Sequence, residues 1–158
     1  MTTLRVLVII IFVVSISVCH RANRQTTAQS EPETAAIDAL YGEWIKATAT
    51  KGADGYVSFF VADGAVLPPG APAVEGKDAI RQWIQKELDE YTLKDGRFVP
   101  GSLKVANGWA IRRFSIAGKR VPKKSGEPIQ VNNKYLDVLQ KQADGTWKFV
   151  YRMWSSNE

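Results

Sequence analysis

The order of apolar and polar positions predicts three helices in the first half of the chain. Apolar side chains recur at steps of three and four residues, the spacing of a helix face that packs on a core. The first such stripe consists of Ile37, Leu40, Tyr41, Trp44, Ile45 and Thr48. Ser30 opens a Ser-x-x-Glu capping pattern ahead of this stripe, and Gly52 interrupts it. A short second helix is predicted to end at Gly64, with apolar positions at Tyr56, Phe59 and Phe60. The third has the stripe Ile80, Trp83, Ile84, Leu88 and Tyr91.

The second half of the chain is predicted to form strands. Two-residue turns at Asn107-Gly108 and Asp144-Gly145 are typical of hairpins. They join extended segments over residues 102–106 and 109–116, and over residues 131–142 and 146–154. A brief strand over residues 65–67 precedes a proline-rich stretch without regular structure. Helices followed by long hairpins predict an α+β domain, with the helices on one face of an antiparallel sheet.

An apolar run at the N-terminus predicts that the protein is exported. The run follows Arg5 and ends at Val18, so it is shorter than the roughly 20 apolar residues that a bilayer span needs. We therefore expect a signal peptide over residues 1–18, a polar tether over residues 19–29 and one folded domain over residues 30–158. A retained membrane anchor is the alternative.

Cys19 is the only cysteine of the chain, so an intramolecular disulfide is excluded. The residues ahead of it, Ile16-Ser17-Val18, resemble the lipobox of bacterial lipoproteins, although Gly or Ala is usual at the position of Val18. Two interpretations stay open. Cys19 is either lipidated, which would tether the protein to a membrane, or a small apolar residue of the signal.

The chain carries a net charge of +5, and its basic residues cluster between Lys94 and Lys124. A polyanion or an anionic lipid surface could bind such a cluster. However, Arg112 and Arg113 are adjacent in a predicted strand and should point to opposite faces, and the residues from Lys119 onward are expected in a solvated loop. Nucleic-acid binding is not expected, because the basic residues lack interleaved aromatic platforms.

Two stretches of the sequence resemble the nuclear transport factor 2-like superfamily, in its SnoaL-like and ketosteroid-isomerase-like branches. They are AVLPPGAPAVEGKDAIRQW at residues 65–83 and KYLDVLQKQADGTWKFVYRMWSS at residues 134–156. The resemblance implies a cone in which a curved antiparallel sheet wraps around three helices and encloses an internal pocket. The second stretch is similar to exported bacterial members, which implies the periplasm or cell envelope as the location.

Histidine and cysteine chemistry is excluded from the predicted domain. His20 is the only histidine and lies outside that domain, as Cys19 does, so a Ser-His-acid relay, a cysteine nucleophile and a histidine-based metal site have no residues to form them. The glycines fall at turns and the carboxylates are scattered, which argues against phosphate-binding and calcium-binding loops. We expect no metal and no cofactor, so acid or base chemistry by carboxylates is what remains.

The resemblance to ketosteroid isomerase implies positions for its catalytic groups. Its general base would fall within residues 67–69, where Pro68 has no group that accepts a proton. Its oxyanion-hole acid is matched by Asp137. Its hydroxyl donor on the first helix is replaced by Trp44, with Tyr41 one turn earlier as the substitute. The implied site therefore lacks its base, which favours a protein that is not an enzyme.

The C-terminal hairpin places Asp137 opposite Arg152 when its turn has two residues. We predict a cross-strand ion pair lining the pocket, with Tyr135 opposite Trp154 and Leu139 opposite Val150. The resemblance implies an acid at the position of Arg152, so the basic side chain indicates either an anionic ligand or a structural salt bridge. The candidate pocket residues are Tyr41, Trp44, Tyr135, Asp137, Arg152 and Trp154.

The opposite face of the same hairpin is predicted to be apolar, with Leu136, Val138, Trp147, Phe149, Tyr151 and Met153. A monomer rarely leaves such a face exposed. The superfamily resemblance implies that a homodimer covers it, and burial under residues 119–128 is the alternative.

Three functions agree with these patterns. The first is an exported pocket protein that binds a small, mostly apolar molecule without catalysis. The second is an isomerase, cyclase or dehydratase that uses Asp137 with Tyr41 or Tyr135. The third is a homodimeric association module.

Overall fold

The computed structural model describes residues 31–157, so the predicted signal peptide, the tether and Cys19 lie outside the described residues. The chain divides into two compact units, Met1–Ala36 and Ile37–Glu158. In the first unit only residues 31–36 are described, and they are helical. The second unit contains the strands and the candidate site. No helix in the described part of the chain is both long and apolar enough to cross a membrane.

Two helices occur in the described residues, where the sequence predicted three. One covers residues 31–57, and the other is α2, Lys77–Glu90. Gly52 has a positive φ of 59°, which glycine adopts readily, and the helix continues past the predicted interruption. The predicted second helix is wrong from residue 58 onward, because Phe60 begins strand β1, Phe60–Leu67. A short apolar run such as Phe59-Phe60-Val61 has no period that separates a helix from a strand.

Within residues 31–157, six strands form one sheet in the order β2-β1-β6-β5-β4-β3. Neighbouring strands are antiparallel except β1 and β6, which are parallel. The sheet is therefore mixed, whereas the sequence predicted an antiparallel sheet. A parallel pair needs a long connection, and most of the domain lies between these two strands. The other strands are β2 Val74–Glu75, β3 Tyr91–Ala106, β4 Trp109–Pro122, β5 Ile129–Lys141 and β6 Trp147–Ser156.

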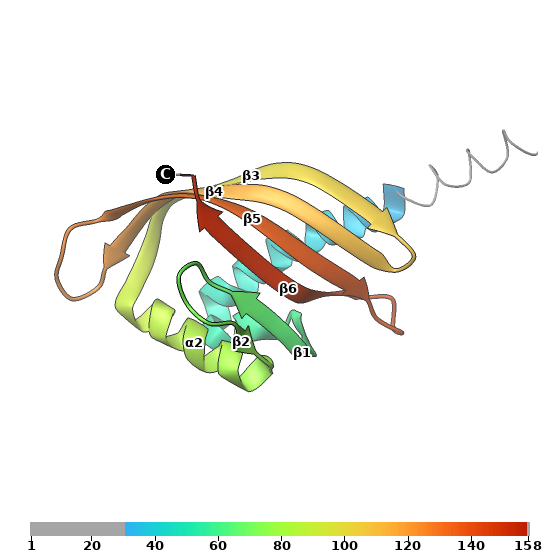
Figure 1. The fold of residues 1–158 in the computed structure, drawn as a ribbon, viewed down its shortest axis with the longest axis horizontal. Coiled ribbons are helices and arrows are strands. Elements are labelled where there is room, and N and C mark those ends of the chain that lie inside the picture. Colours follow the sequence, from blue (N-terminus) through green and yellow to red (C-terminus); the bar gives the residue numbers. More distant parts are fainter. Residues whose placement is uncertain (1–30, 158) are drawn as a thin grey trace, which may run out of the picture. The chain divides into compact units, whose positions relative to one another are not determined.

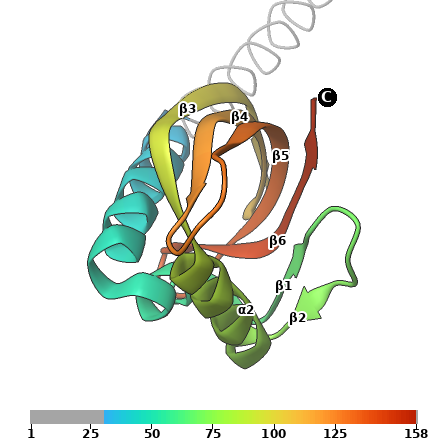
Figure 2. The same ribbon diagram turned by 90° about the vertical axis from the view of Figure 1, so that its left-hand side faces the viewer.

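The helices cover one face of the curved sheet formed by β3 to β6 (Figures 1 and 2). The core between these layers joins Ile37, Tyr41 and Trp44 of the first helix to Phe114 of β4 and Phe149 of β6. We call the face of the sheet toward the helices the inner face and the opposite one the outer face. The predicted α+β class is confirmed.

The β5–β6 hairpin keeps the predicted register at its far end only. Asp137 pairs with Arg152 and Tyr135 with Trp154 as predicted, but Leu139 pairs with Phe149 rather than with Val150. The turn spans residues 143–145, one residue more than predicted, since the Gln142 amide donates to the Thr146 carbonyl. The extra residue Val150 in β6 forms a β-bulge that restores the register.

The bulge also changes which residues of β6 face the core. Trp147 and Phe149 were predicted on the outer face, but both are buried in the core. Beyond the bulge, Tyr151 and Met153 lie on the outer face as predicted, and each side chain is about half exposed. A single extra residue moves every later side chain to the opposite face, because side chains alternate along a strand.

Candidate functional site

A buried ion pair joins the middle of β5 to β6 on the inner face. Arg152 binds Asp137 with two hydrogen bonds, from Nε to Oδ1 at 3.0 Å and from Nη2 to Oδ2 at 2.6 Å. The Tyr41 hydroxyl of the first helix donates to the same Oδ2 at 2.7 Å. The exposed fraction is 0% for Asp137 and 2% for Arg152. This bidentate geometry satisfies the carboxylate with charge-assisted bonds.

Aromatic rings hold the Arg152 guanidinium in place. Its carbon lies 4.0 Å from the centre of the Trp44 ring and 4.3 Å from that of Phe149. Burial opposes the charge of Arg152, but Asp137, together with smaller contributions from Tyr56 and Tyr41, outweighs this effect, and the pKa of Arg152 is raised. Burial and then the negative charge of Asp137 raise the pKa of Tyr41 far above its usual range. Tyr41 therefore acts as a donor, not as a base.

A second arginine lies beside this pair. Arg112 of β4 is directly opposite Asp137, which is directly opposite Arg152, so the three form one row across the inner face. Arg112 is buried and forms a salt bridge to Asp38 on the first helix. The predicted opposition of Arg112 and Arg113 is confirmed, because Arg113 is exposed. Two carboxylates thus balance the two guanidinium groups.

A cavity of about 470 Å³ lies on the inner face above Arg152. Its wall contains six aromatic side chains from the helices and the sheet, namely Trp44, Tyr56, Trp83, Tyr91, Tyr135 and Trp154. Tyr135 stacks on Trp154 with ring centres 5.8 Å apart, and Trp154 contacts Trp83 at 5.7 Å. Such a wall offers flat apolar surface to a ligand.

The outer end of the cavity carries a second ion pair, between α2 and β4. Arg120 Nη2 donates to Glu87 Oε2 at 2.6 Å, and the guanidinium carbon lies 3.6 Å from the centre of the Tyr91 ring. About a third of each charged side chain is exposed, 35% for Arg120 and 34% for Glu87. This pair therefore lies at the solvent side of the cavity, whereas Arg152 lies at its deep end.

The structure brings four of the six candidate residues to the cavity. Trp44, Tyr135, Arg152 and Trp154 line it, and so does Pro68, at the position where the resemblance placed a general base. The other two, Tyr41 and Asp137, lie behind the wall, bonded to each other.

Sequence reasoning missed Glu87 and Arg120. Glu87 follows Ile84 by three residues and Trp83 by four, so the helical stripe places it on the cavity side of α2. Arg120 alternates in step with the inner-face residues Arg112 and Phe114. The expectation of a loop from Lys119 onward concealed this signal and was wrong for Lys119 and Arg120, because β4 continues to Pro122.

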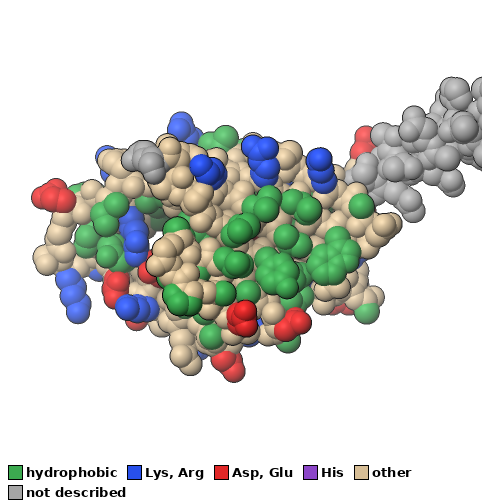
Figure 3. Space-filling model, viewed as in Figure 1, with side chains coloured by type: hydrophobic (Ala, Val, Ile, Leu, Met, Phe, Trp, Pro, Cys, Tyr) green, Lys and Arg blue, Asp and Glu red, His purple; other side chains and the backbone are tan. Residues whose placement is uncertain are grey.

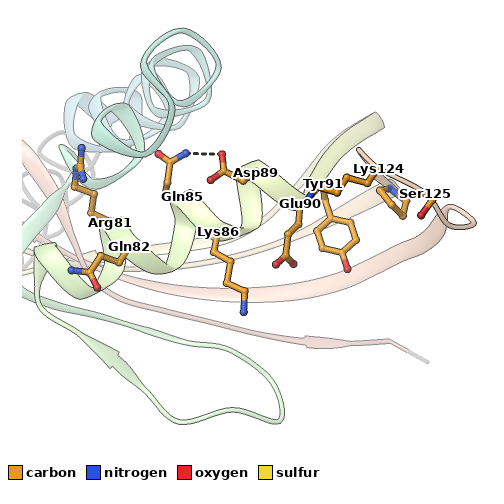
Figure 4. Close-up of a pocket in the computed structure, with 10 residues that line it drawn as sticks. Arg81, Gln82, Gln85, Lys86, Asp89, Glu90, Tyr91, Lys124 and Ser125 are labelled. Atoms are coloured by element: carbon orange, nitrogen blue, oxygen red, sulfur yellow. Dashed lines mark hydrogen bonds between the residues drawn. The ribbon is translucent and has the colours of Figure 1, made fainter.

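A larger hollow of about 760 Å³ lies along the exposed side of α2 (Figure 4). The labelled side chains of α2 point in different directions from the helix, and they mix Arg81 and Lys86 with Asp89 and Glu90. The Gln85 amide bonds to Asp89 on the same helix at 2.8 Å. This open polar groove offers no converging set of groups. Across the described residues, no group of three or more His, Cys, Asp or Glu side chains is placed to hold a metal ion.

Comparison with known proteins identifies the fold. A ketosteroid isomerase-like protein from Erwinia carotovora atroseptica SCRI1043 superimposes with a TM-score of 0.73 at 22% identity, covering 81% of this chain and 98% of that one. A conserved protein from Planctomyces limnophilus gives 0.69 at 16% identity, covering 77% and 94%. ActVI-ORFA from Streptomyces coelicolor gives 0.66 at 19% identity, covering 80% and 98%.

At these identities the structural likeness shows the fold alone, the nuclear transport factor 2-like cone. No curated protein sequence matches the chain. The sequence model of the SnoaL-like domain matches residues 41–150, which is most of the chain and includes both ion pairs except Arg152. The chain therefore belongs to the SnoaL-like domain family.

Proposed function

We propose that this SnoaL-like domain binds a small, largely apolar molecule in the cavity between the helices and the inner face of the sheet. The aromatic wall of Trp44, Trp83, Tyr135 and Trp154 carries this proposal. A cavity of about 470 Å³ is large enough for a molecule of two or three rings, since small-molecule sites typically enclose about 300–1,000 Å³. Apolar surface that leaves water on binding supplies the affinity.

The polar residues beneath the wall support binding rather than catalysis. Asp137 accepts hydrogen bonds from Tyr41 and from two nitrogens of Arg152 and is 0% exposed, so its oxygens are engaged behind the cavity wall. A general base needs a free oxygen within reach of the substrate. An enzyme that uses Asp137, with Tyr41 or Tyr135 as donor, would first have to open this buried pair. The charge of Arg152 is already neutralised by Asp137 in a buried pair, which favours the structural salt bridge among the earlier alternatives.

A titration with the neutral dye N-phenyl-1-naphthylamine tests the proposal on the full-length protein. We expect a saturable rise of dye fluorescence with one dye per chain. Leu88→Trp, which adds bulk to the cavity wall, should weaken binding at least tenfold, whereas Ile111→Trp on the outer face should not. Absence of saturable binding to the folded protein, with no small molecule retained in native mass spectrometry, would rule the proposal out.

A second proposal is association of two copies through the outer face. Large apolar side chains gather over the outer face (Figure 3), and Trp109, Ile111, Tyr151 and Met153 are each close to half exposed. A contiguous apolar surface of this kind commonly marks an interface. Mass measured across a dilution series tests this proposal. We expect a dimer that Ile111→Lys dissociates, and a monomer at every concentration would contradict it.

A further inference from the structure

The ion pair at the deep end of the cavity is buried and bonded within the protein. Arg152 is 2% exposed and donates two hydrogen bonds to Asp137, which is 0% exposed. The Trp44 indole nitrogen has no partner among the described residues, but this atom is itself fully buried and is not presented to the cavity. A polar group of a ligand would lose its hydrogen bonds to water there and would meet charges that already neutralise each other, which is unfavourable.

The outer end of the cavity offers the opposite environment. Glu87 and Arg120 are a third exposed, and both face the cavity as part of its lining. Their mutual bond uses Nη2 of Arg120 and Oε2 of Glu87. A guanidinium has five N–H donors and a carboxylate has about four acceptor positions, so both groups can bond a further partner. The ring of Tyr91 fixes the plane of the guanidinium, because the two lie 3.6 Å apart.

The two charges at this end cancel each other, which restricts the charge of a ligand. A carboxylate that approached Arg120 would also meet Glu87, and an ammonium group that approached Glu87 would meet Arg120. Either ion would lose hydration and face a like charge at short range. A hydroxyl group meets no such conflict, because it can donate to the Glu87 carboxylate and accept from the Arg120 guanidinium.

We propose that the cavity selects an uncharged molecule with an apolar ring body and one hydroxyl group at its end. The body enters first and packs on Trp83, Tyr135 and Trp154, while the hydroxyl bonds to Glu87 and Arg120 at the outer end. This inference rests on the proposed binding function and adds the orientation and the charge class of the ligand. It makes Glu87 and Arg120 the residues that determine specificity.

Four probes with the same naphthalene body test the inference by calorimetric titration of the full-length protein at pH 7. They are naphthalene, 2-naphthylmethanol, 2-naphthoate and 2-naphthylmethylammonium. We expect the alcohol to bind about tenfold more tightly than either ion, because each ion faces one like charge. Naphthalene reports on the apolar body alone.

Two charge-removing variants turn this order into a switch. Glu87→Gln leaves a net positive outer end, so 2-naphthoate should gain about tenfold in affinity and 2-naphthylmethylammonium should lose affinity. Arg120→Gln leaves a net negative outer end and should produce the reverse. Arg113→Gln is the matched control, since Arg113 is on the same strand but exposed on the outer face, and it should change none of the affinities.

The outcomes separate this inference from the proposed function. If naphthalene and the alcohol both fail to bind the folded wild-type protein, the binding function itself is wrong. If naphthalene binds but neither variant changes the order of the two ions, the placement of the polar end at Glu87 and Arg120 is wrong. Thermal unfolding of each variant shows whether it is folded; Glu87→Gln keeps the size of the side chain, whereas Arg120→Gln shortens it.

Discussion

The two ends of the cavity contain the same kind of ion pair in opposite surroundings. Both pairs join an arginine Nη2 to a carboxylate oxygen at 2.6 Å. The Arg152–Asp137 pair is sealed beneath aromatic rings and bonded further to Tyr41. The Arg120–Glu87 pair is open to solvent on one side. The distance alone therefore does not reveal what an ion pair contributes, since burial decides how much each charge depends on its partner.

This difference assigns separate roles to the two pairs. At the deep end, the pair is buried and locks β5, β6 and the first helix together. At the outer end, water competes with the pair, and a ligand can compete in the same way. The predictions below test this division, from the largest expected effect to the smallest.

Asp137→Asn should produce the largest loss of stability. The substitution leaves the buried Arg152 without its counter-charge, and Arg112 of β4 lies directly opposite the altered position. Loss of one partner of a buried ion pair typically costs about 3–5 kcal/mol. Urea unfolding gives the change in the free energy of unfolding. The double variant Asp137→Leu with Arg152→Met should recover most of it, because an apolar pair of similar volume often replaces a buried ion pair well. A loss below about 1 kcal/mol for Asp137→Asn would mean that the pair is not a structural lock.

Tyr41→Phe should have the next largest effect. It removes one hydrogen bond to a buried carboxylate, and bonds to charged groups contribute about 1.5–3 kcal/mol. The two remaining bonds from Arg152 keep Asp137 in place, so the loss should be smaller than that of Asp137→Asn. Urea unfolding of both variants under the same conditions compares them. An equal or greater loss for Tyr41→Phe would contradict the assignment of the lock to the ion pair.

Stability should also fall at alkaline pH because of the deep end. Burial raises the pKa of Tyr41 and of Tyr56, so in the folded protein both hydroxyls keep their protons above the usual pKa of 10.0. The unfolded chain loses these protons as the pH rises past 10, so their contribution is fully present below pH 10 and decreases above it by about 1.4 kcal/mol per pH unit for each tyrosine. Urea unfolding between pH 9 and pH 11 measures this slope. Tyr41→Phe should make it shallower, and an unchanged slope would mean that Tyr41 ionises in the folded state.

The deep pair could be predicted from the sequence, but partly through errors that cancelled. Hairpin register is local information, and it placed Asp137 opposite Arg152 as observed. The turn is one residue longer than predicted and the bulge at Val150 compensates, so the pairing came out right. The same bulge placed Trp147 and Phe149 in the core, against the prediction. The sequence pattern did not predict the bulge, because valine at position 150 is an ordinary residue for a strand.

The outer pair could not be predicted in the same way. Glu87 and Arg120 come from a helix and a strand, and 33 residues separate them in the sequence. Helical spacing and strand alternation each place one of the two toward the interior, but neither fixes the distance between the elements. The prolines and glycine near residue 122 also favoured a loop over the end of β4. The family resemblance supplied the fold, whereas the polar residues that distinguish this cavity depend on packing between distant segments.

Glu87→Gln should have the smallest effect on stability, and that result would sharpen the contrast most. Exposed and half-exposed ion pairs contribute at most about 1 kcal/mol, since water already solvates both charges. Urea unfolding at low salt and at 1 M salt should show a loss below that value, which decreases further with salt because exposed charges are screened. The loss of stability for Asp137→Asn should depend on salt much less, because the ions of the solution do not reach the buried Asp137 and Arg152. If Glu87→Gln lost as much stability as Asp137→Asn, both ion pairs would stabilise the fold. Glu87 and Arg120 would then not be free to exchange their mutual bond for bonds to a ligand.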